Sequence, residues 1–211
     1  MARTKIGIIG SGNMGRAFAK RLAAAGYNVS ITATDSAHAE EAAAKAGANA
    51  RAVRPDGIAG DNDLLILAVP YAAAADALRG AGDLTGRTIV DISNPVTPDY
   101  SALAVGFSTS AAEEIQKAVP TAKVVKAFNT IFAQVLGAAP GGTRAQVLYA
   151  GDDGGAKAAA RALIEILGFE AVDAGPLANA RLLEPLGMLT IYFGYAAGHG
   201  TGIAPAWVAI A

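Results

Sequence analysis

The sequence predicts an α/β fold, with a doubly wound, mostly parallel sheet and a short helical C-terminal extension. Short apolar runs alternate with alanine-rich stretches along most of the 211 residues, and strands that alternate with helices are the pattern of such folds. The runs are continuously apolar, which is typical of strands buried on both faces of a parallel sheet. A glycine-rich turn directly after the first run is the third indication, because such turns join a strand to a helix at phosphate sites.

The expected elements follow one another as strand, then helix. Continuous apolar runs predict strands over residues 5–9, 28–32, 64–69, 88–92, 123–127, 146–150 and 170–173, with a weaker one at 49–53. Stretches with helical spacing predict helices over 13–25, 36–46, 71–79, 110–118, 153–167 and 177–197. Segments 93–109 and 136–145 are rich in Pro, Gly, Ser and Thr, so we expect loops there. Ser110 and Glu113 fit a capping box at the start of the helix at 110–118.

The turn "GSGNMG" at residues 10–15 predicts a dinucleotide site. Gly10 permits the tight turn, Gly12 lets a pyrophosphate approach the backbone, and Gly15 lets the helix pack closely on the strand. The N-terminus of the following helix offers free N–H groups and a positive dipole end to the phosphates. We therefore expect a Rossmann-type NAD(P)-binding domain over residues 1–175. Its phosphate-binding residues are expected to be Gly10, Ser11, Gly12, Asn13, Met14 and Gly15.

The choice between NAD and NADP depends on the end of the second strand. An NAD site has Asp or Glu there, whose carboxylate accepts hydrogen bonds from the ribose hydroxyls. The cofactor residues expected at this place are Thr32, Ala33 and Thr34. Asp35 follows late and fits the N-cap of the next helix, and hydroxyls without a well-placed acid favour NADP. Yet no Arg or Lys occurs in this turn, and Arg51 and Arg54 could help only from a neighbouring strand, so NAD stays open.

The composition narrows the class of partner and the compartment. A net charge of −1 and a pI near 6.1 provide no basic surface for nucleic acid. The chain has no cysteine, which excludes disulfides and thiolate zinc sites. Its acidic pairs suit helix starts and exposed faces, so no metal site is expected. No secretion signal is expected from the first residues, and we predict a cytoplasmic protein.

The C-terminal segment carries no Asp, Glu, Lys or Arg after Glu184. Glycines and prolines interrupt it, so no span of about 20 apolar residues is left to cross a membrane. Arg181 and Glu184 are spaced to pair with each other on a helix. A helix that is apolar nearly all round buries itself against its own core and a second subunit. We expect residues 176–211 to complete the acceptor site and the interface of a homodimer.

The chain offers few groups for acid–base catalysis. His38 falls on a polar helix and His199 in a C-terminal loop, and neither is expected to be catalytic. Lys126 lies inside an apolar strand, where it is either structural or a contact for a phosphate or an acidic ligand. Hydride exchange between two flat rings needs stacking and exclusion of water rather than an acid or a base. The sequence therefore favours hydride transfer between cofactors, and we assign no catalytic residue.

Motifs further along the chain resemble one family. In order they are "LAVPYAAAADAL", "TIVDISNPVTPD", "VVKAFNT", "LYAGDD" and "AGPLANARLLEPLGML". Together they resemble the NADPH-dependent coenzyme F420 reductases (F420-dependent NADP oxidoreductases), to which the reductase domain of the six-transmembrane epithelial antigen metalloreductases is related in fold. The resemblance covers nearly the whole chain. It implies an NADP-dependent oxidoreductase that exchanges hydride between NADPH and a small-molecule acceptor, F420 or a flavin-like compound.

The resemblance also implies roles for matching positions. The cofactor cleft would be lined by Ala68, Val69 and Pro70. The nicotinamide end would lie beside Asn94, Asn129 and, toward the substrate, Pro95. The wall for the second ring system would come from Leu186, Met188 and Leu189. This chain departs from the family at the 2′-phosphate turn, where typical members carry a Ser-Arg-like pair and Ala33-Thr34 stands here.

Other interpretations stay open on the sequence alone. A non-catalytic NAD(P)-binding sensor or partner protein would bind nucleotide without turnover. An NADPH-dependent flavin or ferric reductase would differ only in its acceptor. An imine reductase of the pyrroline-carboxylate-reductase type begins similarly, but it requires a long helical dimerisation domain that the sequence does not show.

Overall fold

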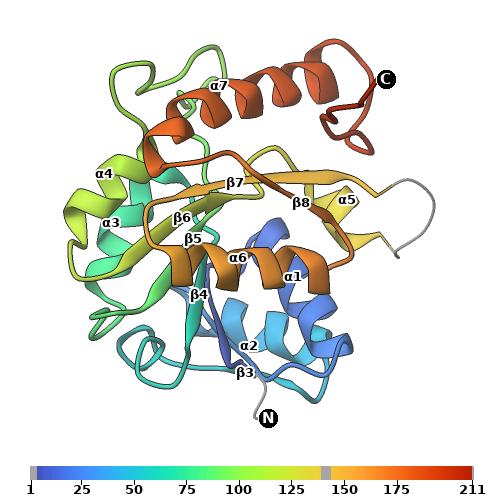
Figure 1. Ribbon diagram of the computed structural model, residues 1–211. Helices are drawn as coiled ribbons and strands as arrows, with labels where there is room; N and C mark the ends of the chain where they lie inside the picture. Colours follow the sequence, from blue (N-terminus) through green and yellow to red (C-terminus); the bar gives the residue numbers. More distant parts are fainter. Residues whose placement is uncertain (1–3, 139–143, 211) are drawn as a thin grey trace.

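A single sheet of eight strands forms the centre of the computed structural model, which describes residues 4–138 and 144–210. Its strands are β1 (Ile6–Ile9), β2 (Val29–Thr32), β3 (Ala50–Ala52), β4 (Leu64–Leu67), β5 (Thr88–Asp91), β6 (Lys123–Ala127), β7 (Gln146–Gly151) and β8 (Glu170–Asp173). The strand order is β3-β2-β1-β4-β5-β6-β7-β8 (Figure 1). Neighbours are parallel except β6 and β7. The predicted fold class and every predicted strand are confirmed.

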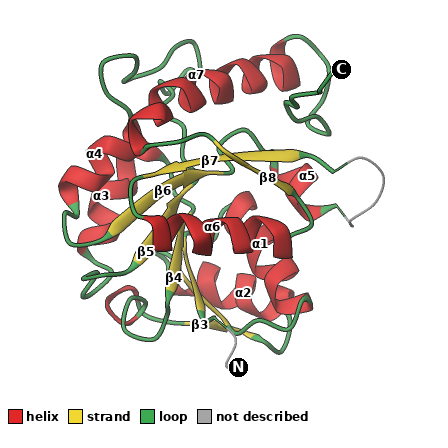
Figure 2. Ribbon diagram, viewed as in Figure 1, coloured by secondary structure: helices red, strands yellow, loops and turns green. Residues whose placement is uncertain are grey.

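Helices cover both faces of the sheet, as Figure 2 shows. One face is covered by α1 (Asn13–Ala24), α2 (Ser36–Ala46), α5 (Ala133–Gly137) and α6 (Gly154–Ile166), and the other by α3 (Tyr71–Arg79) and α4 (Ala111–Ala118). The last helix, α7 (Ala180–Ile191), packs on the side of β7 through Leu183. Because helices cover both faces of the sheet, neither face of a central strand meets water. This explains why the sequences of the strands are continuous apolar runs.

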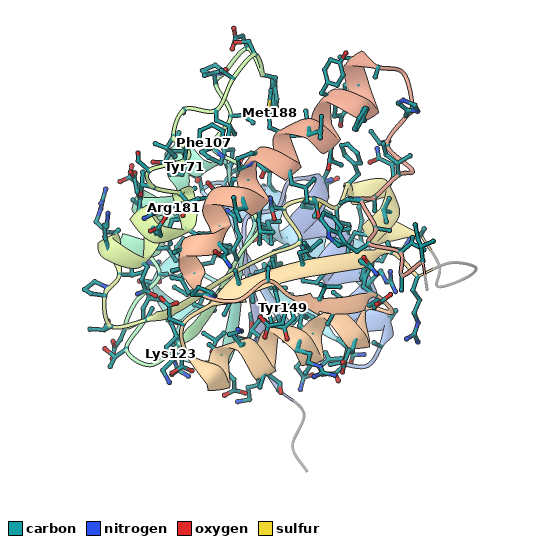
Figure 3. The ribbon with its side chains drawn as sticks, turned by 45° about the horizontal axis from the view of Figure 1, so that its top comes forward. Tyr71, Phe107, Lys123, Tyr149, Arg181 and Met188 are labelled. Atoms are coloured by element: carbon teal, nitrogen blue, oxygen red, sulfur yellow. The ribbon has the colours of Figure 1, made fainter. Side chains whose placement is uncertain are left out.

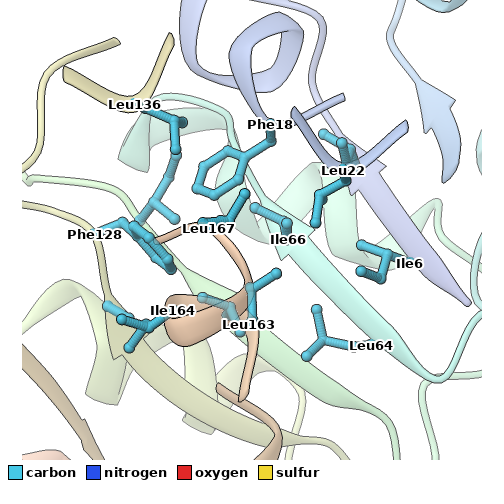
Figure 4. Close-up of a cluster of buried hydrophobic side chains, with 14 of the residues drawn as sticks. Ile6, Phe18, Leu22, Leu64, Ile66, Phe128, Leu136, Leu163, Ile164 and Leu167 are labelled. Atoms are coloured by element: carbon cyan, nitrogen blue, oxygen red, sulfur yellow. The ribbon is translucent and has the colours of Figure 1, made fainter. Parts of the chain in front are cut away.

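The larger hydrophobic core lies between the sheet and the layer of α1 and α6 (Figure 4). Phe18 and Leu22 of α1 are fully buried against Ile66 of β4. Burial of such side chains is the main term that stabilises the fold. A smaller core lies under α3 and α4. The strand order reverses between β1 and β4, and residues at the carboxyl ends of these strands line a cleft. Open α/β sheets bind their ligands at this point.

The antiparallel pair at β6 and β7 has a local cause. The segment after β6 forms the single-turn helix α5, which packs beside α1 instead of crossing over the sheet. The chain therefore re-enters the sheet from the same end at which it left, and β7 runs antiparallel. Sequence reasoning placed no helix at Ala133–Gly137. Of the loop expected over 136–145, residues 139–143 lie outside the described part of the chain.

The predicted C-terminal helix is confirmed, with changes of pitch at its ends. It begins with a 3₁₀ turn at Leu177–Asn179, continues as α7, and ends in a π-helical turn at Tyr192–Ala196. Its outer face leaves large apolar side chains exposed, and these are Leu182, Leu189, Tyr192, Phe193 and Tyr195. No helix within residues 4–138 and 144–210 is both long and apolar enough to span a membrane.

Candidate nucleotide and acceptor site

The glycine turn after β1 has the geometry of a phosphate loop. Gly10 has φ +114, a left-handed conformation that favours glycine, and a Cβ there would collide with the backbone oxygen of Ala68. A Cβ at Gly15 would collide with the backbone oxygen of Gly10. At Gly12, by contrast, an added Cβ would have no heavy atom within 4 Å. Two glycines are therefore needed for packing, while the third leaves the backbone open to a ligand.

The N-terminus of α1 faces this open backbone. Gly12 is the N-cap of α1 and makes no side-chain hydrogen bond to the helix. The first N–H groups of α1 are thus left to a ligand, and the helix dipole favours an anion there. The loop is fixed from the side by Arg16, whose Nε donates to the backbone oxygen of Ser11 at 2.8 Å. The other end of the guanidinium pairs with Glu41 of α2 at 2.9 Å.

A cleft of about 720 Å³ opens beside the loop, at the carboxyl ends of β1, β2 and β4. It brings together most of the cofactor residues expected from the sequence: Gly10, Ser11, Gly12, Thr32, Ala33, Thr34, Ala68, Val69 and Pro70. Residues that the sequence did not single out also line it, among them Ile58, Ala73, Asp76 and Ala77, together with His38 of α2. The cleft has the size and the place that a dinucleotide needs.

An unpaired hydroxyl in this cleft fits a ribose. Thr32 is 2% exposed, and its Oγ1 has no hydrogen-bond partner in the protein. Its backbone oxygen accepts a hydrogen bond from the N–H of Gly10 at 2.8 Å, which ties the end of β2 to the phosphate loop. Buried hydroxyls are almost always hydrogen-bonded. A lone one at the edge of a ligand cleft therefore favours a polar ligand group as its partner.

A second cavity, of about 270 Å³, lies at the other end of the phosphate loop. Asn13 and Met14 line one side, and Asn94 and Asn129 the other. The two asparagines are joined reciprocally: Asn94 Nδ2 donates to the backbone oxygen of Asn129 at 2.7 Å, and Asn129 Nδ2 donates to Asn94 Oδ1 at 3.0 Å. This pair fixes the loops after β5 and β6 against each other beside the expected nicotinamide position.

Phe128 sets the direction of the second loop. It has φ +59, a left-handed conformation that a bulky residue adopts at a cost of about 1–2 kcal/mol. Its ring is buried and lies edge-to-face against Phe18, with 5.1 Å between the ring centroids (Figure 4). The ring of Phe169 lies edge-to-face with it at a centroid distance of 6.0 Å. Because this packing holds the ring in the core, the backbone turns and presents Asn129 to the cavity.

The wall contributed by α7 touches both loops. Asn129 Nδ2 also donates to the backbone oxygen of Leu183 at 2.7 Å. A Cβ added at Gly187 would collide with Asn94 Oδ1 and lie 2.8 Å from Asn129 Nδ2. Gly187 is therefore the point where α7 approaches the asparagine pair, and only a residue without a side chain fits there.

A buried cluster of charged side chains joins β5, β6, α4 and α7 next to these loops. Lys126 Nζ lies 2.7 Å from Asp91 Oδ2, 2.8 Å from Glu184 Oε1 and 2.6 Å from the backbone oxygen of Ser93, and all three ionic side chains are fully buried. Glu184 also accepts hydrogen bonds from the first backbone N–H groups of α4, at residues 111 and 112. We call Asp91, Lys126 and Glu184 the ionic cluster. Lys126 is structural and lines none of the cavities described above, which decides between its two interpretations.

The expected pairing of Arg181 with Glu184 is wrong. Arg181 instead binds Glu113 of α4 with two hydrogen bonds, of 2.8 and 2.6 Å. Glu184 is on the inner side of α7 and binds Lys126. Helical spacing alone could not show this, because both partners come from elements distant in sequence. The capping box is confirmed in its first half, since Ser110 Oγ accepts from Glu113 N at 3.2 Å, while the Glu113 carboxylate accepts from the Ser110 hydroxyl at 2.8 Å rather than from the Ser110 N–H.

A third cavity, an apolar groove of about 610 Å³, continues from the second. The two share Tyr100, Ile191 and Tyr195, and Met188 lines the groove from α7. Figure 3 shows Met188 on the side of α7 that faces the loop carrying Phe107. The other residues expected at the acceptor lie outside the groove: Leu186 packs on the cluster around Leu148, Leu189 is exposed, and Pro95 accepts a hydrogen bond from Ala104 N at 2.6 Å.

Two ionisable groups with a shifted pKa, Asp99 and Tyr71, are not suited to proton transfer at neutral pH. Hydrogen bonds from Thr97 and Ser101 lower the pKa of Asp99, at the rim of the groove, to about 2. Burial, and then the hydrogen bond to Glu114, raise the pKa of Tyr71 to about 12. Asp99 therefore stays ionised and Tyr71 stays protonated. Among the described residues, no group of three or more His, Cys, Asp or Glu could hold a metal ion.

The fold and the paired cavities define an NAD(P)-dependent oxidoreductase of the Rossmann type. A family profile described as "NADP oxidoreductase coenzyme F420-dependent" matches residues 5–95. The F420-dependent NADP reductase of Methanothermobacter thermautotrophicus is 31% identical over 204 residues, which cover 89% of this chain and 88% of that protein. The chain therefore belongs to the family of F420-dependent NADP oxidoreductases, and NADP(H) is the dinucleotide of that family.

Two further comparisons agree with this family. A crystal structure assigned to an F420-dependent NADP reductase from Arthrobacter sp. FB24 has a TM-score of 0.82 and 30% identity, and the match covers 94% of this chain and 97% of that one. Metalloreductase STEAP3 of Rattus norvegicus is 32% identical over 182 residues. The match spans 86% of this chain but only 36% of STEAP3. The resemblance drawn from the sequence motifs is confirmed.

Proposed function

We propose that the chain transfers hydride between NADPH and a deazaflavin or flavin-like acceptor, with coenzyme F420 as the first candidate. The observation that carries this proposal is the apolar groove, which continues from the cavity beside Asn94 and Asn129. Tyr100, Tyr195 and Ile191 belong to both spaces. Aromatic and aliphatic walls of this kind suit a flat ring system.

The residues of the chain bind and orient in this proposal, and they move no proton. A bound reduced nicotinamide supplies the hydride. Asn94 and Asn129 hold the ring end in place, the phosphate loop holds the pyrophosphate, and α7 excludes water from the contact of the two rings. Asp99 is ionised and Tyr71 is bound to Glu114 at 2.6 Å, so neither donates a proton. This agrees with an acceptor that takes hydride at carbon without a dedicated acid.

The proposal also assigns a separate role to each of two parts of the chain. Residues 1–175 bind the dinucleotide, and residues 176–211 complete the acceptor site and the interface of a homodimer. The exposed apolar face of α7 supports the interface, because contiguous apolar surface of this kind is typical of subunit contacts. Sedimentation velocity tests it: Leu189→Glu should give a monomer, whereas Ile166→Glu on the outside of α6 should leave the dimer intact.

Stopped-flow loss of NADPH absorbance tests the acceptor. F420, FMN, FAD and a ferric chelate are compared, the last because one relative is named a metalloreductase. Rapid oxidation with F420 alone supports the proposal, and oxidation with FMN, FAD or the chelate alone replaces F420 by that acceptor. Nucleotide binding without oxidation by any of them would favour the sensor or partner protein instead.

A variant pair locates the acceptor. Met188→Trp fills the groove and should raise the KM for the acceptor about tenfold or more while the Kd for NADPH is unchanged. Ile166→Trp, on the partly exposed face of α6, is the matched control and should change neither constant. An equal loss in both variants would place the acceptor outside the groove.

A further inference from the structure

The end of the nucleotide cleft at β2 and α2 has an unusual balance of charge for an NADP site. In a Rossmann fold this end receives the adenosine ribose, and an Arg there accommodates a 2′-phosphate. Of the described residues that line the cleft, none is Lys or Arg. The ionisable ones are two carboxylates, Asp35 and Asp76, and His38, and Asp76 is paired with Arg79. The cleft thus lacks a permanent positive charge for a phosphate dianion.

The arginines nearest in sequence to this end are already paired. Arg16 binds Glu41 and the phosphate loop. Arg51 binds Asp61 at 2.8 Å and lines a separate cavity at the opposite ends of the strands. Arg54 binds Asp56 at 3.3 Å. Each guanidinium thus contacts a carboxylate in this structure, and none of the three lines the cleft.

The carboxylate of Asp35 is placed to receive hydroxyl groups rather than a phosphate. Its Oδ1 accepts from the N–H of Ala37 at 2.9 Å and caps α2. Its Oδ2 lies 3.7 Å from Nδ1 of His38, and more than half of the side chain is exposed. A carboxylate beside a ribose binds the free 2′-hydroxyl and repels a 2′-phosphate.

The unpaired hydroxyl of Thr32 suits either form of the ribose and does not supply the missing positive charge. It is buried at the same end of the cleft and has no partner within the protein. A neutral hydroxyl can donate to or accept from a ribose hydroxyl, and it carries no charge to offset a dianion. Thr34, two residues on, is exposed and likewise neutral.

We propose that this chain binds NAD(H) with an affinity comparable to that for NADP(H), and that the turn 34–38 sets this balance. The selectivity for the 2′-phosphate that a cationic turn provides is absent here. The inference concerns nucleotide binding alone, so it stands whichever acceptor the enzyme reduces.

Isothermal titration calorimetry of the whole chain tests the inference without an acceptor. The titrants are NADP⁺ and NAD⁺, together with adenosine 2′,5′-bisphosphate and adenosine 5′-monophosphate, which differ only by the 2′-phosphate. We expect the two Kd values in each pair to differ by less than about tenfold, whereas a bidentate arginine contact would give about tenfold or more. A preference of tenfold or more for the 2′-phosphorylated members overturns the proposal.

A matched pair of Thr34 variants tests whether the turn 34–38 faces the 2′ position of the adenosine ribose. Thr34→Arg should tighten binding of NADP⁺ by about tenfold or more and leave NAD⁺ nearly unchanged. Thr34→Met adds length without charge and should change neither. Since Thr34 is exposed, both variants should unfold at the wild-type temperature. If Thr34→Arg changes both nucleotides equally, the turn does not face the 2′ position and the proposal fails.

Discussion

The two halves of the candidate site are built in different ways. The nucleotide half, around Gly10 and Thr32, comes from residues that follow strands directly, and its main feature is open backbone. The acceptor half depends on the asparagine pair, Gly187 and the ionic cluster, which join β5, β6, α4 and α7. Substitutions at open positions of the first half, such as Gly12, should therefore lower affinity without lowering stability, whereas substitutions in the second half should lower both.

The largest effect should come from the ionic cluster. Lys126→Met leaves two buried carboxylates, of Asp91 and Glu184, without their cation, and we expect the free energy of unfolding to fall by about 3–5 kcal/mol. Urea denaturation measures it. Arg161→Met breaks an exposed pair with Glu165 and should cost less than about 1 kcal/mol. Similar small losses in both variants would mean that the cluster does not hold α7 in place.

Substitution at the contact of α7 with the asparagines should have a smaller effect on stability. Gly187→Ala pushes against Asn94, which two hydrogen bonds hold in place, and should cost about 1–3 kcal/mol. Acceptor turnover should fall by a larger factor than the affinity for NADPH, because Asn94 is expected only at the nicotinamide end while the phosphate loop still holds the pyrophosphate, as stopped-flow and calorimetry would show. Gly154→Ala, where an added Cβ meets nothing, is the control. Equal losses of turnover and nucleotide affinity in Gly187→Ala would contradict the separation of the two halves.

A substitution in the phosphate loop should weaken nucleotide binding without lowering stability. Gly12 has an ordinary φ of −69 and open space around it, so Gly12→Ala should leave the free energy of unfolding unchanged or slightly raised. The added methyl group occupies the place of the pyrophosphate, and we expect the Kd for nucleotide to rise about tenfold or more, a loss of about 1.4 kcal/mol. Destabilisation of this variant would show that the loop, too, depends on tight packing there.

The smallest effect concerns the exposed edge between α4 and α7. Arg181, through its hydrogen bonds, lowers the pKa of Glu113 below its ordinary 4.5. A lowered carboxyl pKa stabilises the fold above pH 4.5, and this contribution disappears as the pH falls through the folded-state pKa. Arg181→Gln should thus lower the urea midpoint slightly at pH 7 and by less below pH 4.5. Urea midpoints at several pH values measure it, and a constant difference would rule out this pair as the source.

The sequence predicted the nucleotide half well because its signals are local. Continuous apolar runs located every strand, and the spacing of Gly10, Gly12 and Gly15 located the phosphate loop. The sequence pattern does not predict the helix α5, because this helix is a single turn. It forms through its packing on α1 and has no periodic apolar pattern.

Long-range contacts explain what the sequence left undetermined. Arg181 and Glu184 were expected to pair because they are neighbours on a helix, yet each binds a residue more than fifty positions away. A signal for the ionic cluster was present, since Asp91 and Lys126 follow directly on apolar residues inside their strands and a buried charge requires a partner. Nothing in the linear pattern identified Glu184 as that partner or Gly187 as the close contact.

The position of Glu184 in the chain has a consequence for synthesis. The ribosome makes β5, β6 and α4 well before it reaches residue 184, and nascent domains begin to fold from their N-terminal side. Until Glu184 emerges, the first N–H groups of α4 have no carboxylate to bind, and Lys126 is paired with Asp91 alone. A nascent chain stopped at residue 175 therefore still lacks the residue that caps α4 and forms the second ion pair of Lys126.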